Sequence, residues 1–343
     1  MGEPMDINGP STNRAPETEL TETENELYDR QIRLWGLESQ KRLGAAKVLI
    51  SGLSGVGAEI AKNIILAGVS AVKLNDHRIV TEEDFCAQFL TPRSAVGKNR
   101  AEASVERARA LNPMVKISVD KEPLVGKKAE FFAEFDVVVI IGALDSELLR
   151  INEICREKGI KFFSGDVWGT FGYCFADLQD HSYFEDVVKH KVVSEPNEKT
   201  KTEVVTTTIQ KELKFPSYAS ISQFDVNTPT FQKKLKRTGP AFILLRILQM
   251  FRDKHNRDPS YLSRQEDIKE LMCLAQELIS APFVPSDMLE YVFSQISPSA
   301  AVVGGVLAQE IIKVVTKKEA PHRNVFLFDP ETCCGFVETV GVH

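Results

Sequence analysis

Short apolar runs alternate with helical patterns between Leu27 and about Leu178. The runs are rich in Val, Ile and Phe and are separated by polar or glycine-containing segments, as is typical of buried strands. We predict strands at 47–51, 71–75, 115–119, 135–142 and 160–164, and helices at 58–67, 99–111 and 146–158. This order predicts an α/β fold with a Rossmann-like, mostly parallel sheet that has helices on both faces.

The last of these predicted helices carries its own boundary signals. Asp145 stands where a helix N-cap is expected, and Gly159 follows as a C-terminal stop. Leu148, Ile151 and Cys155 fall on one helical face. We expect that face to pack on the sheet.

The segments outside this pattern divide the chain. Residues 1–26 are acidic, rich in Thr, Pro and Asn, and poor in large apolar side chains, so we predict a disordered tail. After the Rossmann-like domain at 27–180, residues 181–295 are predicted to form an inserted, largely helical subdomain. Residues 296–343 then return to the first domain.

Three further elements are predicted in the second half of the chain. The run VVTTTIQ at 204–210 favours a β segment inside the insertion. A small-residue helix is expected at 299–315, and the runs 324–328 and 335–340 are close enough to form a hairpin.

Composition and charge narrow the classes of partner. The formal net charge of −6 argues against nucleic acid as the main partner. The run 241–251 is too short to span a membrane and is interrupted by Arg246, and we expect no other run near the required length. No signal segment is apparent at the N-terminus, so we expect a protein that acts inside the cell.

The six cysteines are scattered and form no C-x-x-C pair. This spacing offers no zinc framework, so we expect no bound metal. Cys86, Cys155 and Cys174 lie in or beside predicted sheet elements, where we expect buried, unreactive thiols.

A glycine turn joins the first predicted strand to the first helix. Its glycines are Gly52, Gly55 and Gly57, and Asp76 ends the second strand, where an acid can hold a ribose hydroxyl. Such a turn offers unpaired N–H groups and the positive end of a helix dipole. The order G-x-x-G-x-G differs from the dinucleotide fingerprint, so the turn favours a nucleotide-type fold more than NAD binding. The glycines are equally consistent with a tight turn and close helix–strand packing.

Upstream of this turn, the segment YDRQIRLWG at 28–36 resembles the entry to the non-thioester half of ubiquitin-like protein activating enzymes. The resemblance continues through AKNIILAGV, AQFL, NRAEAS, LNP, GDVWGTFGYCFADL, RDPS and AVVGGVLAQEIIK. It implies a ThiF/MoeB-type adenylation fold in its pseudo-active form. Chain length, the run 162–178 and the run 257–260 resemble the small, regulatory subunits of SUMO-activating enzymes. The corresponding NEDD8-type subunits share 28–36 but are considerably longer.

The nucleotide pocket that this family uses is altered here. Ser54 stands at the second glycine of the family's G-x-G-G-x-G, and Arg78 at the second acid of its D-x-D. Ala87 stands at the phosphate-binding arginine, and Arg100 at a lysine. The resemblance therefore implies a vestigial pocket that binds no cofactor productively, formed by Gly52, Ser54, Gly55, Gly57, Asp76 and Asp145.

In this family the N-terminal helix of one adenylation-type fold reaches the nucleotide of the other. Arg30 matches the arginine that approaches the partner's ATP, and Arg33, one turn further, is its candidate support. The resemblance implies a heterodimer with a large catalytic subunit that binds ATP and Mg²⁺, adenylates SUMO and then holds it as a thioester. A nuclear location, with some protein in the cytoplasm, is expected on the same ground.

Four other functions stay open at this point. The chain could be the regulatory subunit of a NEDD8-type enzyme, or a self-sufficient homodimeric adenylating enzyme, which Ser54 and Ala87 disfavour. It could also be an NAD-dependent oxidoreductase, which the glycine order disfavours, or a non-catalytic module that stabilises another chain.

Overall fold

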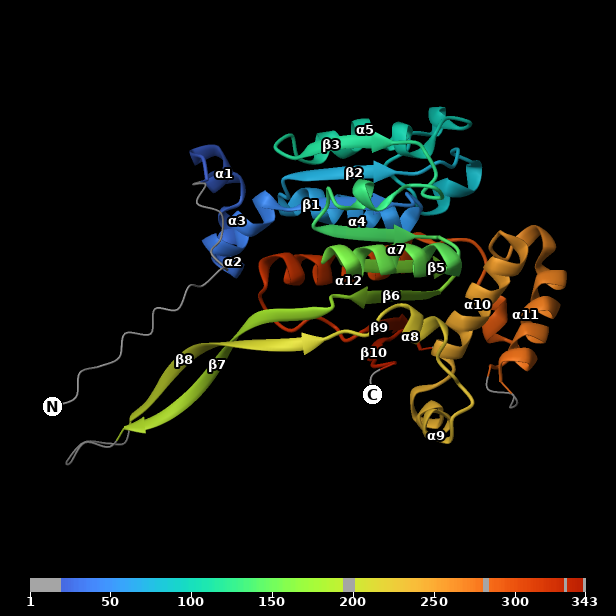
Figure 1. Ribbon diagram of the computed structural model, residues 1–343. Coiled ribbons are helices and arrows are strands. Elements are labelled where there is room, and N and C mark those ends of the chain that lie inside the picture. Colours follow the sequence, from blue (N-terminus) through green and yellow to red (C-terminus); the bar gives the residue numbers. More distant parts are fainter. Residues whose placement is uncertain (1–19, 194–200, 280–283, 330–331, 342–343) are drawn as a thin grey trace.

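The computed structural model describes residues 20–193, 201–279, 284–329 and 332–341. Its centre is an eight-stranded sheet with the order β10-β9-β6-β5-β4-β1-β2-β3 (Figure 1). The strands are β1 (Lys47–Ser51), β2 (Ala71–Asn75), β3 (Lys116–Asp120), β4 (Val137–Ile141), β5 (Lys161–Trp168), β6 (Phe171–Asp177), β9 (Val325–Phe328) and β10 (Gly335–Glu338). The five strands from β1 to β5 are parallel, whereas β6, β9 and β10 pair antiparallel. The predicted parallel sheet is confirmed, and β6 is an element that the sequence analysis missed.

Helices cover both faces of this sheet, as predicted. One face packs against α3 (Leu37–Ala45), α4 (Gly55–Ala67), α5 (Arg100–Leu111) and α12 (Ser297–Thr316). The other packs against α6 (Ala129–Phe132), α7 (Asp145–Lys158), α8 (Ala219–Ser222) and α10 (Ala241–His255). Every residue of β4 is buried, and its side chains alternate between the two hydrophobic clusters, which explains its continuous apolar run.

Helix α7 confirms most of the boundary analysis. Leu148, Ile151 and Cys155 are buried in one cluster with the sheet, and Gly159 is the left-handed C-cap. The N-cap assignment was wrong, because the cap is Leu144 and Asp145 is the first helical residue.

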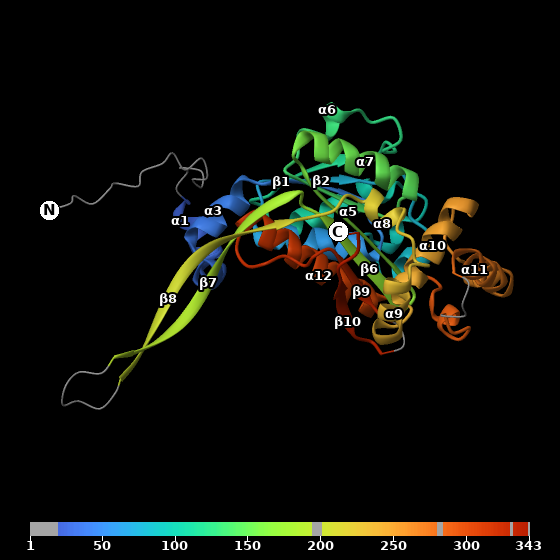
Figure 2. The same ribbon diagram turned by 60° about the horizontal axis from the view of Figure 1, so that its bottom comes forward.

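The insertion has two parts. Strands β7 (Asp180–Val193) and β8 (Lys201–Lys214) form an antiparallel ribbon that projects away from the sheet (Figures 1 and 2). The helical part comprises α8, α9 (Pro229–Thr238), α10 and α11 (Arg264–Leu278). Because these helices share one hydrophobic cluster with the sheet, the division at residues 180 and 295 stays a prediction.

The N-terminal region is helical sooner than expected. Helix α1 covers Glu22–Leu27 and begins at a capping box of Thr21 and Glu24, so the predicted disorder is wrong for residues 22–26. Residues 1–19 lie outside the described residues. Helix α2 (Asp29–Trp35) follows, and Figure 1 places α1 to α3 at the end of the sheet where the parallel strands begin.

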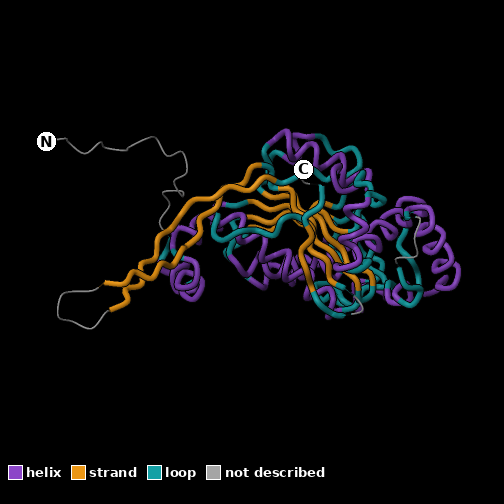
Figure 3. Tube along the Cα trace, turned by 90° about the horizontal axis from the view of Figure 1, so that it is seen from below, coloured by secondary structure: helices purple, strands orange, loops and turns teal. Residues whose placement is uncertain are grey.

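Helix α12 corrects the expectation that no run approaches the length of a membrane span. Among the described residues, α12 is the one helix that is long enough and apolar enough to cross a membrane, by length and composition only. It is largely buried here and packs along α4, β5 and β6. Gly304 permits that contact, since a Cβ there would lie 2.6 Å from the Cβ of Glu59 on α4. The tube view in Figure 3 shows the strands of the sheet, the ribbon and the surrounding helices from below.

Candidate functional site

A cleft of about 640 Å³ lies beyond the carboxyl ends of the parallel strands, where α/β sheets bind ligands. Ser54 and Gly55 line it, as predicted for the vestigial pocket. Its wall on the side of β2 and α5 includes Arg78, Asp84, Ala87 and Arg100, and its opposite wall includes Trp168, Arg252, Asp258 and Gln295. The other residues of the predicted pocket do not line the cleft; they are Gly52, Gly57, Asp76 and Asp145.

All three glycines of the turn are required by packing. Gly52 has φ +91°, and a Cβ there would lie 2.1 Å from the carbonyl oxygen of Ile141 on β4. A Cβ at Gly57 would lie 1.9 Å from the carbonyl oxygen of Gly52, and one at Gly55 would lie 2.3 Å from the Cβ of Ala87. The glycine pattern therefore needs no bound nucleotide to explain it.

The N-terminus of α4 is satisfied from within the chain. The backbone N–H of Gly55 donates to Oε1 of Gln295 at 3.1 Å, and Nε2 of Gln295 donates to Oδ1 of Asp166 at 2.9 Å. The neutral amide oxygen of Gln295 thus accepts the hydrogen bond that the Gly55 N–H would otherwise donate to a phosphate. Ser54 is the N-cap, and its buried hydroxyl has no hydrogen-bond partner among the described residues.

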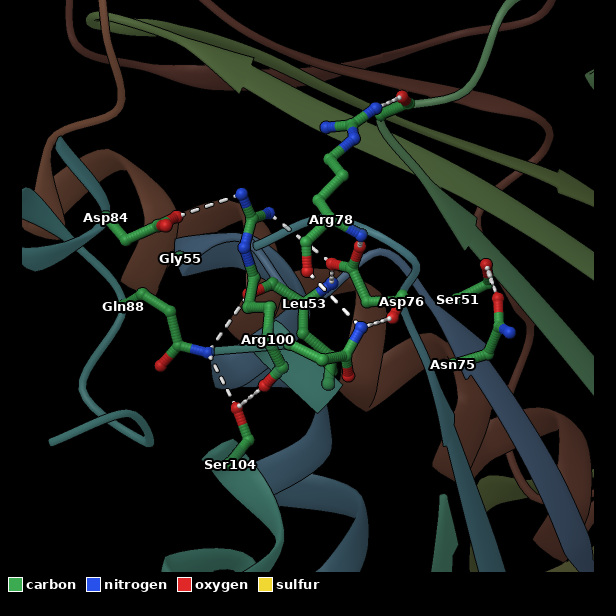
Figure 4. A network of polar contacts seen from close by, with 12 residues as sticks. Ser51, Leu53, Gly55, Asn75, Asp76, Arg78, Asp84, Gln88, Arg100 and Ser104 are labelled. Atoms are coloured by element: carbon green, nitrogen blue, oxygen red, sulfur yellow. Dashed lines mark hydrogen bonds and ion pairs between the residues drawn. The ribbon is translucent and has the colours of Figure 1, made fainter. Parts of the chain in front are cut away.

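Asp76 is also engaged by its own chain (Figure 4). Its carboxylate accepts from the backbone N–H of Leu53 at 2.7 Å and of Arg78 at 2.9 Å. Arg100 lies between Asp76 at 3.4 Å and Asp84 at 3.2 Å, and all three side chains are buried. The cation at the family's lysine position is therefore held by two carboxylates.

Arg78 lines the cleft at the end of β2. Its guanidinium donates to the carbonyl oxygen of Gly142 at 2.6 Å and so bridges the ends of β2 and β4. With Ala87 in place of an arginine and Asp84 nearby, this wall offers few unpaired cations to an incoming triphosphate of about four negative charges. The residues present do not fit Mg²⁺-triphosphate.

The opposite wall holds a buried ion pair that the sequence analysis did not assign. Arg252 on α10 donates to Asp166 on β5 at 2.5 Å and to Asp258 at 2.7 Å, and its guanidinium lies 4.6 Å from the Trp168 ring centre. Trp168 Nε1 donates to the same Asp258 at 2.8 Å. GDVW and RDPS were recognised only as family-like segments, and the structure shows that they meet here.

Asp145 is a correction to the predicted pocket. Its carboxylate accepts hydrogen bonds from the hydroxyls of Tyr218, at 2.7 Å, and Ser222. Burial raises the pKa of Tyr218, which keeps this hydroxyl protonated as a donor. Asp145 therefore links α7 to α8, because its side chain points toward the inserted helices.

Arg30 and Arg33 lie far from this cleft, on α2 at the opposite end of the sheet (Figure 1). Tyr28 fixes this helix, since its buried hydroxyl accepts from Asn112 at 2.9 Å. Arg30 is exposed and has no hydrogen bond or ion pair within the described part of the chain. Arg33 is exposed and pairs with Asp29 at 3.0 Å.

Three leucines near Arg30 in the sequence, on or beside α2, are exposed. Leu27, Leu34 and Leu37 expose 54%, 73% and 43% of their areas. Exposed apolar clusters of this kind mark protein–protein contact surfaces. The structure thus separates the predicted site residues into a cleft and a distant exposed helix.

Among the described residues, the cysteines and the possible metal ligands form no third site. Cys155 and Cys174 are buried, but Cys86 is exposed because it ends a short surface 3₁₀ helix, so its predicted burial was wrong. Within residues 20–193, 201–279, 284–329 and 332–341, no group of three or more His, Cys, Asp or Glu side chains could hold a metal ion.

Comparisons with known proteins agree with this geometry. The model of the ThiF family matches residues 28–336. The chain is 42% identical to SUMO-activating enzyme subunit 1 of Xenopus laevis, covering 95% of this chain and 98% of that protein. It is 43% identical to the protein of the same name from Homo sapiens, covering 94% and 96%.

Solved structures support the fold alone. The crystal structure of E. coli MccB with succinimide gives a TM-score of 0.52 at 13% identity, covering 91% of this chain and 71% of that one. The crystal structure of PaaA gives 0.55 at 16% identity, covering 97% and 78%.

Proposed function

Since the chain belongs to the ThiF family, as a small subunit of the SUMO-activating kind, we propose that it works as the regulatory half of a heterodimer. The large subunit binds ATP and Mg²⁺, adenylates the carboxyl terminus of SUMO, and then captures SUMO as a thioester on its own cysteine. This chain scaffolds that reaction and supplies Arg30 in trans. A nuclear location, with some protein in the cytoplasm, is part of the same proposal.

The contacts inside the chain's own cleft support the proposal that the large subunit binds the nucleotide. Gln295 occupies the Gly55 N–H, Arg100 is held by Asp76 and Asp84, and Ala87 packs where a phosphate-binding side chain would start. A triphosphate would have to displace these contacts and bring its charge beside Asp84. The productive nucleotide site is therefore assigned to the partner.

The single observation that carries the role of Arg30 is its placement. It is an exposed arginine with no partner among the described residues, on a helix anchored by Tyr28 and surrounded by exposed leucines. It lies at the end of the sheet opposite its own cleft, so it cannot serve that cleft (Figure 1). A guanidinium delivered to a neighbouring active site neutralises phosphate charge as it redistributes in the transition state.

The test is reconstitution of the heterodimer with SUMO and ATP, measuring SUMO-adenylate formation by pyrophosphate exchange. Arg30→Ala should lower the rate at least about tenfold, equivalent to about 1.4 kcal/mol, while subunit association stays unchanged. Arg33→Ala is the matched control on the same helix, and its effect should be smaller because Arg33 is paired with Asp29. Unchanged adenylation by Arg30→Ala would reject the role in trans and leave the scaffold role.

A further inference from the structure

A second, smaller hollow of about 220 Å³ lies at the base of the ribbon, away from the cleft. Three elements meet there: helix α3, the end of α12 and the first residues of the β7–β8 ribbon. Its walls are Ser39, Arg42, Phe184, Asp186, Thr208, Thr316, Lys317 and Lys318.

Three cations from two separate elements converge on this hollow. Arg42 comes from α3, and Lys317 and Lys318 directly follow α12; all three are half-buried. Neither Arg42 nor Lys318 forms an ion pair with a carboxylate within the described part of the chain. The one carboxylate in the lining, Asp186, is exposed and accepts from the hydroxyl of Thr208 at 2.6 Å.

The guanidinium of Arg42 and the backbone of Lys317 are held in place by their contacts with α12 and Phe184. Arg42 Nη1 donates to the carbonyl oxygen of Thr316 at 2.7 Å, and its guanidinium lies 6.0 Å from the centre of the Phe184 ring. Phe184 and Lys317 are joined by a backbone hydrogen bond of 2.8 Å, and Lys317 adopts the left-handed conformation that ends α12. The Arg42 side chain, held in this way, loses little conformational freedom when an anion binds.

The positive charges gathered in this hollow act on one another. Burial and the neighbouring guanidinium of Arg42 lower the pKa of Lys317. Like charges gathered away from bulk water repel one another, and an anion seated between them relieves that repulsion.

We propose that this hollow is an oxyanion site that takes a phosphate group. A planar guanidinium combined with ammonium groups and the hydroxyl of Ser39 is the donor set that phosphate oxygens prefer. The hollow is smaller than the roughly 300 Å³ of the smallest usual ligand pockets, so it admits phosphate or pyrophosphate but not a whole nucleotide. The phosphate comes either as the free ion or on a phosphorylated side chain of another protein.

Binding to the full-length chain is measured by isothermal titration at fixed ionic strength, with chloride as the reference anion. The probes are inorganic phosphate, pyrophosphate, and a phosphoserine peptide beside its unphosphorylated form. Tighter binding of either free ion identifies a free-anion site, and tighter binding of the phosphopeptide identifies a docked side chain. Both outcomes support the proposal.

Two variants and one control locate the site. Lys318→Gln and Arg42→Gln should each weaken phosphate binding at least about tenfold, and Lys318→Gln decides the question if Arg42→Gln fails to fold. Lys116→Gln makes the same charge change on exposed strand β3 and should bind like the wild type. The proposal is overturned if no probe binds above chloride, or if Lys116→Gln weakens binding as much as Lys318→Gln.

Discussion

Replacing Arg252 with Met tests whether the buried ion pair of Arg252 and Asp166, in the wall of the cleft, stabilises the fold. Arg252 exposes 6% and Asp166 exposes 1% of their areas, so both charges are almost fully removed from water. Methionine keeps the aliphatic volume of the arginine stem but leaves the carboxylate of Asp166 without its cation. The perturbation is therefore electrostatic more than steric.

The expected loss of stability follows from these contacts. Removing one partner of a buried ion pair costs about 3–5 kcal/mol, because the other charge stays buried and unpaired. Asp166 keeps hydrogen bonds from Gln295 and from the backbone N–H of Val167, which places the estimate at the lower end, about 3 kcal/mol. The contact with Asp258 adds little, since that side chain is 42% exposed.

Urea unfolding of the full-length chain at pH 7, followed by tryptophan fluorescence and by circular dichroism, measures the loss. Lys121→Met is the matched control, because it breaks an exposed pair with Glu102 and should cost less than about 1 kcal/mol. The double variant with Asp166→Asn should lose less than the sum of the two single variants. A loss below about 1 kcal/mol for Arg252→Met would show that the pair does not stabilise the fold.

Three further predictions concern stability and its pH dependence. Gly57→Ala should cost about 1–3 kcal/mol in urea unfolding, because its Cβ would lie 1.9 Å from the carbonyl oxygen of Gly52; an unchanged midpoint contradicts this. Hydrogen bonds from Arg257 lower the pKa of Asp267 from 3.8 to about 2, so its contribution to stability is lost as the pH falls through this interval. Asp267→Asn should flatten the plot of unfolding free energy against pH between about pH 4 and 2. An unaltered plot refutes the lowered pKa of Asp267. Burial lowers the pKa of His181 from 6.5 to about 4. As the pH falls from 6.5 to 4, the unfolded chain therefore binds a proton before the folded chain does, and the stability of the fold decreases. His181→Gln should reduce the dependence of the melting temperature on pH in this interval.

Local pattern alone predicted the parallel strands of the sheet and several of the helices on it, but not strand β6. Strands β1 and β2 lie at the predicted residues 47–51 and 71–75. In β1 the apolar run Val48–Ile50 is buried, as expected for a central strand covered on both faces. Helix α7 was also predictable, since its apolar face and its C-terminal glycine are local signals. The segment at 28–36 likewise identified the family before any geometry was known.

The state of the cleft was decided only by the tertiary structure. Gln295 reaches the N–H of Gly55 from 240 positions along the chain, and no local period encodes such a contact. Asp145 follows β4 as predicted, yet its side chain turns toward Tyr218 on the inserted segment, because hydrogen bonds there satisfy a partly buried carboxylate. Sequence shows which charges are present, whereas folding decides which of them neutralise one another. Among the described residues, that outcome leaves Arg30 without an ion-pair partner.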